Sequence, residues 1–274
     1  MKFVLKSSAK ILILNELCKI VKNLTSYICF EFRENGLYIQ TMDDSHICLS
    51  DILFEREWFD LYDDTPDEDG YNLMNIQAAI FIKILSLQMP NTTLEISAND
   101  KNEKMIITLS TSNDEKSFEI PLMDIEKDGL EPGENDYDCD FKINTKLMDK
   151  YMNELMIFGD VIQLSCKNDN LYLQTDGING NMKIKIPHDN LVDLCVEQGA
   201  VVKSKFDIKY ISFITKCSQI FKNINISFDN QYPLYININE DNVKVKYYIA
   251  PKTNDDDVDS DDENIIVDNA EIED

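Results

Sequence analysis

Residues 36–49, GLYIQTMDDSHICL, hold the pattern that decides the fold, because the first half of this stretch returns later in the chain. The segments CFEFRENGLYIQT (29–41) and LSCKNDNLYLQT (164–175) share the sequence L-Y-[IL]-Q-T. Their common residues are separated by a constant offset of 134, which pairs Tyr38, Gln40 and Thr41 with Tyr172, Gln174 and Thr175. A repeat of this length predicts two copies of one structural unit.

A second match supports the duplication. The triplet Asn-Glu-Leu lies upstream of each copy in a helix-like stretch, at residues 15–17 and at residues 153–155. Each unit should therefore contain a helix, a strand, a tight turn and a strand, and Asn35-Gly36 favours the positive φ of a hairpin turn. The sequence predicts an α+β fold with antiparallel sheets and two helices in each unit.

The expected elements follow from apolar spacing. We predict helices at residues 8–23, 73–87, 145–157 and 207–218. Residues 57–62 should continue the first sheet, and residues 188–199 should form a loop. Residues 123–137 are rich in Gly, Pro and acidic residues and show no periodicity, which predicts a linker. The expected division is a first domain at 1–122, a linker at 123–137, a second domain at 138–253 and a disordered acidic tail at 254–274.

The formal charge of −25 is unevenly distributed. Residues 254–274 contain eleven acidic residues and no basic residue, which leaves −14 for the preceding part. Apolar runs such as 78–82 are far shorter than the roughly 18 residues of a membrane span. Seven cysteines without a C-x-x-C pair argue against a zinc site and indicate reduced thiols. We expect an intracellular protein that binds no metal and no membrane.

Basic residues recur on the predicted helices, on the side away from the apolar residues. The first helix presents Asn15, Lys19 and Lys22, the third presents Lys146, Lys150 and Asn153, and the fourth presents Lys209, Ser212 and Lys216. Such faces suit a surface that binds a polyanion, and they equally suit lysines that only solvate a helix. The spacing alone leaves both interpretations open.

Four separated segments resemble the proliferating cell nuclear antigen (PCNA) family, the eukaryotic-type DNA sliding clamps, and occur in the family's order. They are GLYIQTMDDSHICL (36–49), PLMDIEKDGLEPGENDYDC (121–139), KYISFITK (209–216) and KYYIAPK (246–252), and the resemblance covers residues 3–252. It implies a homotrimeric ring with the DNA clamp fold, in which four helices per chain line a hole for double-stranded DNA and the sheets form the outer wall. It also implies a polymerase processivity factor that is not an enzyme and uses no cofactor.

The resemblance places lysines of the helices toward the DNA. These are Lys22, Lys150, Lys209 and Lys216, with Lys19, Lys83 and Lys146 as further candidates. The family usually has lysine where this chain has Asn15 and Glu16, which predicts a less positive hole. Because the whole chain is acidic, we expect loading onto DNA to depend on an ATP-dependent clamp loader.

The resemblance also implies a groove beneath the linker that receives a short peptide with a glutamine and two aromatic residues, carried by DNA polymerase and other proteins. Apolar side chains suit the aromatic residues, and the backbone near residues 250–252 suits an added strand. Pro132 and Gly133 stand where the family usually has isoleucine and proline, so the linker side of the groove departs from the family pattern. The matching groove positions are Met42, His46, Ile47, Leu49, Leu130, Pro233, Tyr248, Ala250 and Pro251.

Two strands are candidates for the subunit interface that the resemblance implies. KSFEIP (116–121) contains Phe118, Glu119 and Ile120, and NMKIKIP (181–187) contains Lys183, Ile184 and Lys185. Both alternate apolar and polar residues, and Glu119 would complement Lys183 or Lys185, although ordinary edge strands have the same pattern. The lysine that carries ubiquitin in many family members aligns with Asn168, so that regulation is not expected here. We expect the protein in the nucleus, or at a viral replication site if it is viral.

Two other functions stay open. A checkpoint-type clamp subunit would have the same fold but would join different subunits in a heterotrimer. A metal-dependent nuclease would use the many acidic residues, and Asp43, Asp44 and His46 suggest a metal or acid–base cluster. No second carboxylate and histidine pair at ligand spacing supports such a cluster, so the clamp is preferred.

Overall fold

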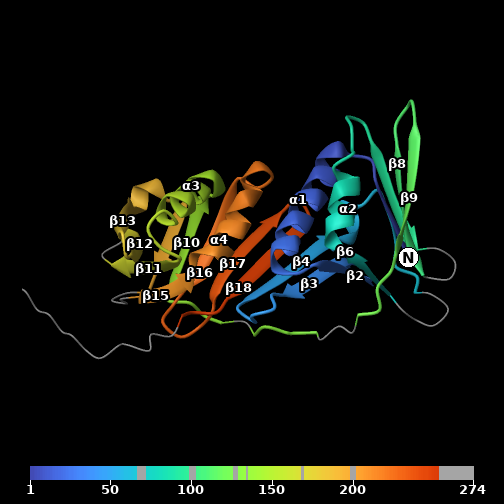
Figure 1. Ribbon diagram of the computed structural model, residues 1–274. Helices are drawn as coiled ribbons and strands as arrows, with labels where there is room; N and C mark the ends of the chain where they lie inside the picture. Colours follow the sequence, from blue (N-terminus) through green and yellow to red (C-terminus); the bar gives the residue numbers. More distant parts are fainter. Residues whose placement is uncertain are drawn as a thin grey trace, which may run out of the picture.

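The computed structural model describes residues 1–66, 72–98, 103–125, 129–133, 135–167, 170–197 and 202–252. In this part of the chain four α-helices lie on one side of the molecule and the β-sheets lie on the other side (Figure 1). The fold is α+β, as predicted. The predicted acidic tail and Asn168 fall outside the described residues.

The first half alternates strands with two helices that pack on each other. Helix α1 buries Ile11, Leu14, Leu17 and Val21, which share one face because the apolar residues recur at helical spacing. Its elements are β1 (Lys2–Leu5), α1 (Ser8–Leu24), β2 (Tyr27–Arg33), β3 (Gly36–Met42), β4 (Cys48–Glu55), β5 (Leu61–Asp63), β6 (Leu73–Gln77), α2 (Ala78–Leu85), β7 (Thr93–Ala98), β8 (Lys104–Ser110) and β9 (Glu115–Pro121).

The second half has a similar order, and its two helices also pack on each other. Asn144 caps the first of them, because its side-chain oxygen accepts a hydrogen bond from the amide of Leu147. The elements are β10 (Cys139–Asn144), α3 (Thr145–Leu155), β11 (Val161–Lys167), β12 (Asn170–Gly177), β13 (Gly180–Pro187), β14 (Asp193–Val196), β15 (Val202–Asp207), α4 (Ile208–Thr215), β16 (Asn223–Phe228), β17 (Leu234–Glu240) and β18 (Val243–Ile249).

The predicted duplication is visible in the strand register. Glu31 lies opposite Tyr38 in the β2–β3 hairpin, and Ser165 lies opposite Tyr172 in the β11–β12 hairpin. Both members of the second pair lie 134 residues after their counterparts, so the offset found in the sequence relates two equivalent hairpins.

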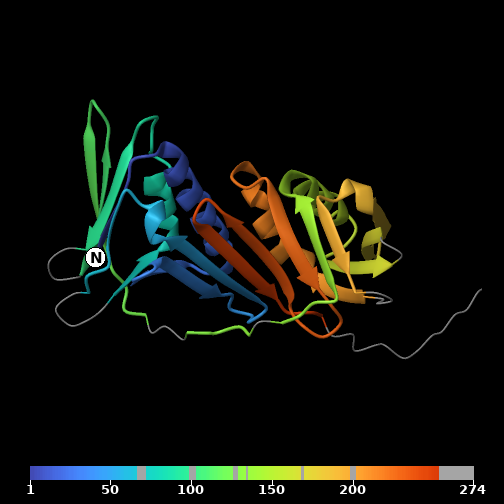
Figure 2. The same ribbon diagram turned by 180° about the vertical axis from the view of Figure 1, so that it is seen from behind.

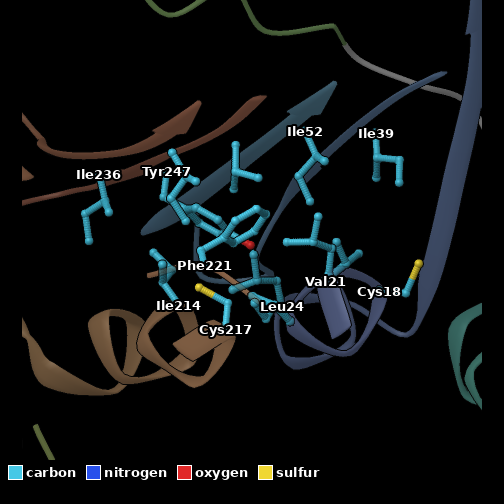
Figure 3. Close-up of a cluster of buried hydrophobic side chains, with 14 of the residues drawn as sticks. Cys18, Val21, Leu24, Ile39, Ile52, Ile214, Cys217, Phe221, Ile236 and Tyr247 are labelled. Carbon is cyan, nitrogen blue, oxygen red and sulfur yellow. The ribbon is translucent and has the colours of Figure 1, made fainter. Parts of the chain in front are cut away.

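One antiparallel sheet joins the two halves. Its nine strands have the order β14-β10-β16-β17-β18-β4-β3-β2-β6, and the pairing of β18 with β4 connects the second half to the first. Beneath this junction, Tyr247 is fully buried with Val21 and Leu24 of α1 and with Ile214 of α4 (Figure 3). The halves therefore share one hydrophobic core and hold a fixed relative placement.

Two smaller antiparallel sheets end the molecule. One has the order β5-β1-β7-β8-β9, and the other has the order β13-β12-β11-β15. Strands β9 and β13 are thus edge strands, and they lie at opposite ends of the molecule (Figure 1). None of the helices in the described ranges is long and apolar enough to cross a membrane.

Several expected elements were wrong. Residues 73–77 form strand β6 on β2, so the predicted second helix begins only at Ala78. Residues 74–77 alternate apolar and polar as a strand does, but the strand is short and runs without a turn signal into the apolar helix, so the two read as one element. Of the predicted strand at 57–62, Glu57 and Trp58 lie in a 3₁₀ turn, whereas Leu61 and Tyr62 belong to β5, which pairs with β1. The predicted loop at 188–199 contains β14, which pairs with β10.

Two residues assigned to exposed helix faces are buried instead. Asn15 is 3% exposed and its side-chain amide lies 3.5 Å from the hydroxyl of Ser86, at the end of α2. Ser212 of α4 is 4% exposed. In each half a neighbouring helix packs alongside, and the spacing within one helix carries no information about that neighbour.

Candidate functional site

The described residues of the linker lie along the face of the nine-stranded sheet that the helices leave free (Figure 2). Three side chains attach its described residues to the sheet. The backbone carbonyl of Asn75, in β6, accepts a hydrogen bond from the amide of Met123. The side-chain amide of Asn75 donates to the carbonyl of Ile125 at 3.2 Å. Gln40 and Tyr137 form the other two attachments. Each attachment fixes backbone that would otherwise lie free on the surface.

Gln40 of β3 holds the middle of the linker through both ends of its amide. Its Nε2 donates to the carbonyl of Leu130 at 2.6 Å, and its Oε1 accepts from the amide of Leu130 at 3.0 Å. The same Nε2 lies 2.9 Å from the hydroxyl of Tyr38, which donates to Asp51 at 2.8 Å. Burial and the hydrogen bond to Asp51 raise the pKa of Tyr38, so its hydroxyl stays protonated and donates.

A cation completes this network. The guanidinium of Arg33 lies 3.4 Å from the ring centroid of Tyr38, and it forms two hydrogen bonds with the carboxylate of Glu31. The stacking fixes the tyrosine ring, and the ring in turn orients the amide of Gln40. The side chain that holds Leu130 therefore comes from β3, and the side chains that orient it come from the neighbouring strands β2 and β3.

Asp43 organises the loop between β3 and β4. Its Oδ1 accepts the amides of Ile47 at 2.8 Å and of Cys48 at 2.6 Å, and its Oδ2 accepts the amide of Ser45 and the hydroxyl of Tyr210. Burial raises the pKa of Asp43, but these four hydrogen bonds outweigh burial and leave the pKa below its usual value. Asp43 is thus a charged acceptor that shapes the loop.

A first cavity of about 560 Å³ opens between this loop, the linker and the first half of the sheet. His46, with φ of 56°, belongs to its lining, and its Nδ1 lies 3.1 Å from the sulfur of Met42. Of the predicted groove residues, Met42, His46, Leu49 and Leu130 line this cavity. Its lining is more apolar than polar, which suits aliphatic or aromatic groups.

A second cavity of about 550 Å³ lies farther along the linker, over the second half of the sheet. Tyr137 of the linker stacks on Tyr235, Tyr235 stacks on Tyr248, and the hydroxyl of Tyr137 donates to the carbonyl of Pro233 at 3.1 Å. Pro132 and Gly133, the two positions that depart from the family pattern, also line this cavity.

The predicted groove residues line two neighbouring cavities. Tyr248 lines the second cavity and lies directly opposite Leu49 of the first in the β18–β4 pairing. Ile47, Pro233, Ala250 and Pro251 line neither, although the amide of Ala250 donates to the carbonyl of Ile47 and so joins the end of β18 to the loop. The two cavities therefore lie side by side where β4 pairs with β18, and the linker passes from the first to the second between its attachments at Gln40 and Tyr137.

Sequence reasoning missed the residues that hold the linker. Gln40 was marked only as part of the repeat, and its counterpart Gln174 bonds the side chain of Asp176 instead. The contact of Gln40 with Leu130 spans 90 residues, and no local pattern indicates it. Asn75 lay in a predicted helix, and Tyr137 stood at the end of the predicted linker. A tyrosine in a stretch that is otherwise acidic was the one available signal for Tyr137.

The seven predicted DNA-facing lysines are all exposed, on or next to the four helices of the described chain. Three of them have acidic neighbours: Lys19 lies 2.6 Å from Glu16, and Lys150 and Lys209 lie 3.7 Å from Glu154 and Asp207. These carboxylates weaken the positive field of the helix side. The remaining candidates are Lys22, Lys83, Lys146 and Lys216.

The predicted interface residues lie on the two edge strands. On β9, Phe118 is half-buried, Ile120 is buried, and Glu119 is exposed with its carboxylate 2.7 Å from Lys104. On β13, Ile184 is half-buried, while Lys183 and Lys185 are exposed. Phe118 and Ile184 both pack against the hydrophobic core, so they lie on the core face of their strands, and the alternating Glu119, Lys183 and Lys185 lie on the other face.

Asp43, Asp44 and His46 line one cavity, but they form no metal centre. Asp43 uses both carboxylate oxygens for the loop amides and Tyr210. Within the described ranges, no three histidine, cysteine, aspartate or glutamate residues are placed to hold a metal ion.

Comparison with known proteins agrees with this architecture. Residues 5–131 match the family described as proliferating cell nuclear antigen, N-terminal domain, and residues 132–253 match its C-terminal domain. The fold is similar to the crystal structure of a PCNA2–PCNA3 complex from Sulfolobus tokodaii, with a TM-score of 0.79 and 20% identity over 92% of this chain and 99% of that chain. The chain therefore belongs to the proliferating cell nuclear antigen family of DNA sliding clamps, which bind DNA and partner proteins, form multimers and catalyse no reaction.

Proposed function

We propose that this clamp is a homotrimer that encircles double-stranded DNA and acts as a polymerase processivity factor. The observation that carries the proposal is the pair of edge strands, β9 and β13, at opposite ends of a molecule whose helices all lie on one side. A contact between two different ends of identical chains repeats from one copy to the next, and it closes into a ring when the rotation between copies is right.

The chemistry of the two edges supports self-assembly. The outer face of β9 carries Glu119, and the outer face of β13 carries Lys183 and Lys185, so a β9–β13 pair would bring opposite charges together. On the core face, Phe118 and Ile184 would complete their burial. Because both complementary edges belong to the same chain, identical chains can pair with one another. This favours the homotrimer over a checkpoint-type heterotrimer.

The exposed lysines on the helices support the proposal that the ring encloses DNA. Contacts with phosphates do not depend on sequence and allow movement along the duplex. The body is acidic and several lysines have carboxylate neighbours, so we expect the free ring to bind DNA weakly and to need an ATP-dependent clamp loader. The expected place of action is the nucleus, or a viral replication site if the protein is viral.

The first cavity supports the tethering of DNA polymerase and other clients. It presents Met42, Leu49 and Leu130 to an incoming side chain, beside a linker held in place by Gln40. An aromatic residue in such a pocket would provide most of the affinity. A peptide with one glutamine and two aromatic residues is the proposed ligand class.

Light scattering of the purified chain tests the assembly. The homotrimer predicts a mass three times the chain mass of 31.7 kDa at micromolar concentration. A monomer under those conditions would favour the heterotrimer, the alternative that draws support from the heteromeric composition of the similar archaeal complex. Titration with a fluorescent peptide of the proposed class, with an alanine-substituted peptide as control, tests the groove separately.

A further inference from the structure

We propose that Tyr210 is a positioning residue for the partner groove and that it acts through Asp43. The inference rests on the proposed binding of a peptide at the first cavity. It adds a residue from helix α4, on the opposite side of the sheet and in the other half of the chain. Tyr210 does not line the cavity, so its contribution would be indirect.

The contact is short and buried. The hydroxyl of Tyr210 donates to Oδ2 of Asp43 at 2.6 Å, across 167 residues of chain. Tyr210 is 3% exposed and Asp43 is 7% exposed. Hydrogen bonds to a buried carboxylate are among the stronger ones in proteins, because few water molecules compete for the acceptor.

The hydroxyl fixes the orientation of the carboxylate. With Oδ2 held by Tyr210 and by the amide of Ser45, Oδ1 faces the amides of Ile47 and Cys48, from which it accepts at 2.8 and 2.6 Å. Those amides set the course of the loop that supplies Asp44 and His46 to the cavity. Loss of the hydroxyl would leave Oδ2 with only the longer bond, at 3.2 Å, and would loosen the carboxylate and the loop.

The same contact ties the groove to helix α4. The ammonium of Lys209 lies 4.5 Å from the ring centroid of Tyr210, and Asp207 caps the helix through the amide of Lys209. Burial and the neighbouring Asp43 raise the pKa of Tyr210, so its hydroxyl remains a donor. Tyr210, which we propose shapes the groove, therefore lies next to Lys209, one of the predicted DNA-facing lysines.

Tyr210→Phe tests the inference, because it removes only the hydroxyl. The probe is a fluorescent peptide with one glutamine and two aromatic residues, and we expect its Kd to rise about tenfold. The matched control is Tyr62→Phe, which removes the hydroxyl of a half-buried tyrosine that donates to the carbonyl of Arg33 at 3.1 Å, opposite the start of β3, whereas the loop follows the end of β3. We expect both variants to lose thermal stability and only Tyr210→Phe to lose peptide affinity.

A second measurement separates positioning from general destabilisation. In a cycle with Asp43→Asn, the substitution Tyr210→Phe should weaken peptide binding much less than it does in the wild-type chain, because the partner through which it acts is altered. Hydrogen exchange at the amides of Ile47 and Cys48 should be faster in Tyr210→Phe than in Tyr62→Phe.

Each outcome decides one claim. Wild-type affinity in Tyr210→Phe, together with lowered thermal stability, would show that Tyr210 is only structural. Equal losses from Tyr210→Phe in the wild-type and Asp43→Asn chains would show that it does not act through Asp43. Failure of the wild-type chain itself to bind the peptide would instead contradict the proposed function.

Discussion

The side-chain amide of Gln40 makes two hydrogen bonds with the backbone of Leu130, one as donor and one as acceptor. This pairing gives the linker the kind of contact that a neighbouring strand would give, although it has no regular structure there. The position of Leu130, which is 42% exposed beside the first cavity, therefore depends on a residue of β3.

Replacement of Gln40 by alanine should release the middle of the linker. Two hydrogen bonds of about 1 kcal/mol each would be lost, and the wall formed by Leu130 would become mobile. We expect the affinity for a glutamine and double-aromatic peptide to fall about tenfold. Limited proteolysis should cut the linker faster than in the wild-type chain.

The duplication provides the control for this experiment. Gln174 lies 134 residues after Gln40, in the equivalent hairpin, but its amide bonds the side chain of Asp176. Gln174→Ala should leave both the peptide affinity and the proteolysis rate unchanged. Equal effects of the two substitutions would show that the contact with Leu130 does not position the groove.

The hairpin that introduces the repeat should tolerate no side chain at its turn. Gly36 has φ of 138°, and a Cβ at this position would lie 2.1 Å from the carbonyl oxygen of Phe54. We expect Gly36→Ala to lower the free energy of unfolding by about 2 kcal/mol or more, measured by urea denaturation. Gly133→Ala, where a Cβ meets nothing within 4 Å, is the control and should change stability little.

The fold was largely predictable because its signals are local. Asn35-Gly36 and the alternation around it predicted the β2–β3 hairpin, and the offset of 134 predicted its copy. Strand β6 was missed because its five residues run without a turn signal into the apolar helix α2, and β14 because its four residues are too short to show a period. Both strands are specified by the partner strand they pair with.

The site was less predictable because it is built from contacts over long sequence distances. The resemblance named Met42, Leu49 and Leu130, which line one cavity, and Tyr248, which lies opposite Leu49 and lines the neighbouring cavity. The stacking of Tyr137 on Tyr235, which fixes the end of the linker, was not predicted. Side-chain partners 90 or more residues apart leave no trace in local spacing.

The loop that Asp43 organises should weaken in acid. The folded-state pKa of Asp43 lies below its usual value, so its contribution is complete above the unfolded pKa of about 3.9 and is lost as pH falls through the folded pKa. Asp43→Asn should therefore be less stable than the wild type at pH 7, with a difference that shrinks below about pH 4. Urea denaturation at both pH values measures it, and a constant difference would contradict this assignment.

The charges on the edge strands should govern assembly. Lys183→Glu would place like charges opposite Glu119 of the neighbouring copy in the proposed interface, and we expect a lower trimer fraction in light scattering at low salt. The combined variant Glu119→Lys with Lys183→Glu restores opposite charges and should regain trimer. Failure of the swap to restore assembly, with both chains folded by circular dichroism, would place the contact elsewhere.

The lysines of the helix side should matter for DNA and not for assembly. Lys150→Glu combined with Lys216→Glu should reduce polymerase processivity strongly, because two exposed helix-side cations per chain become anions near the phosphates. The matched control is Lys167→Glu with Lys203→Glu, which makes the same change of charge at exposed residues of β11 and β15. If both double variants reduce processivity equally while remaining trimeric, net charge alone is responsible, and the helices do not face the DNA. A selective loss in the first variant, with an unchanged mass in light scattering, would place α3 and the end of α4 beside the duplex.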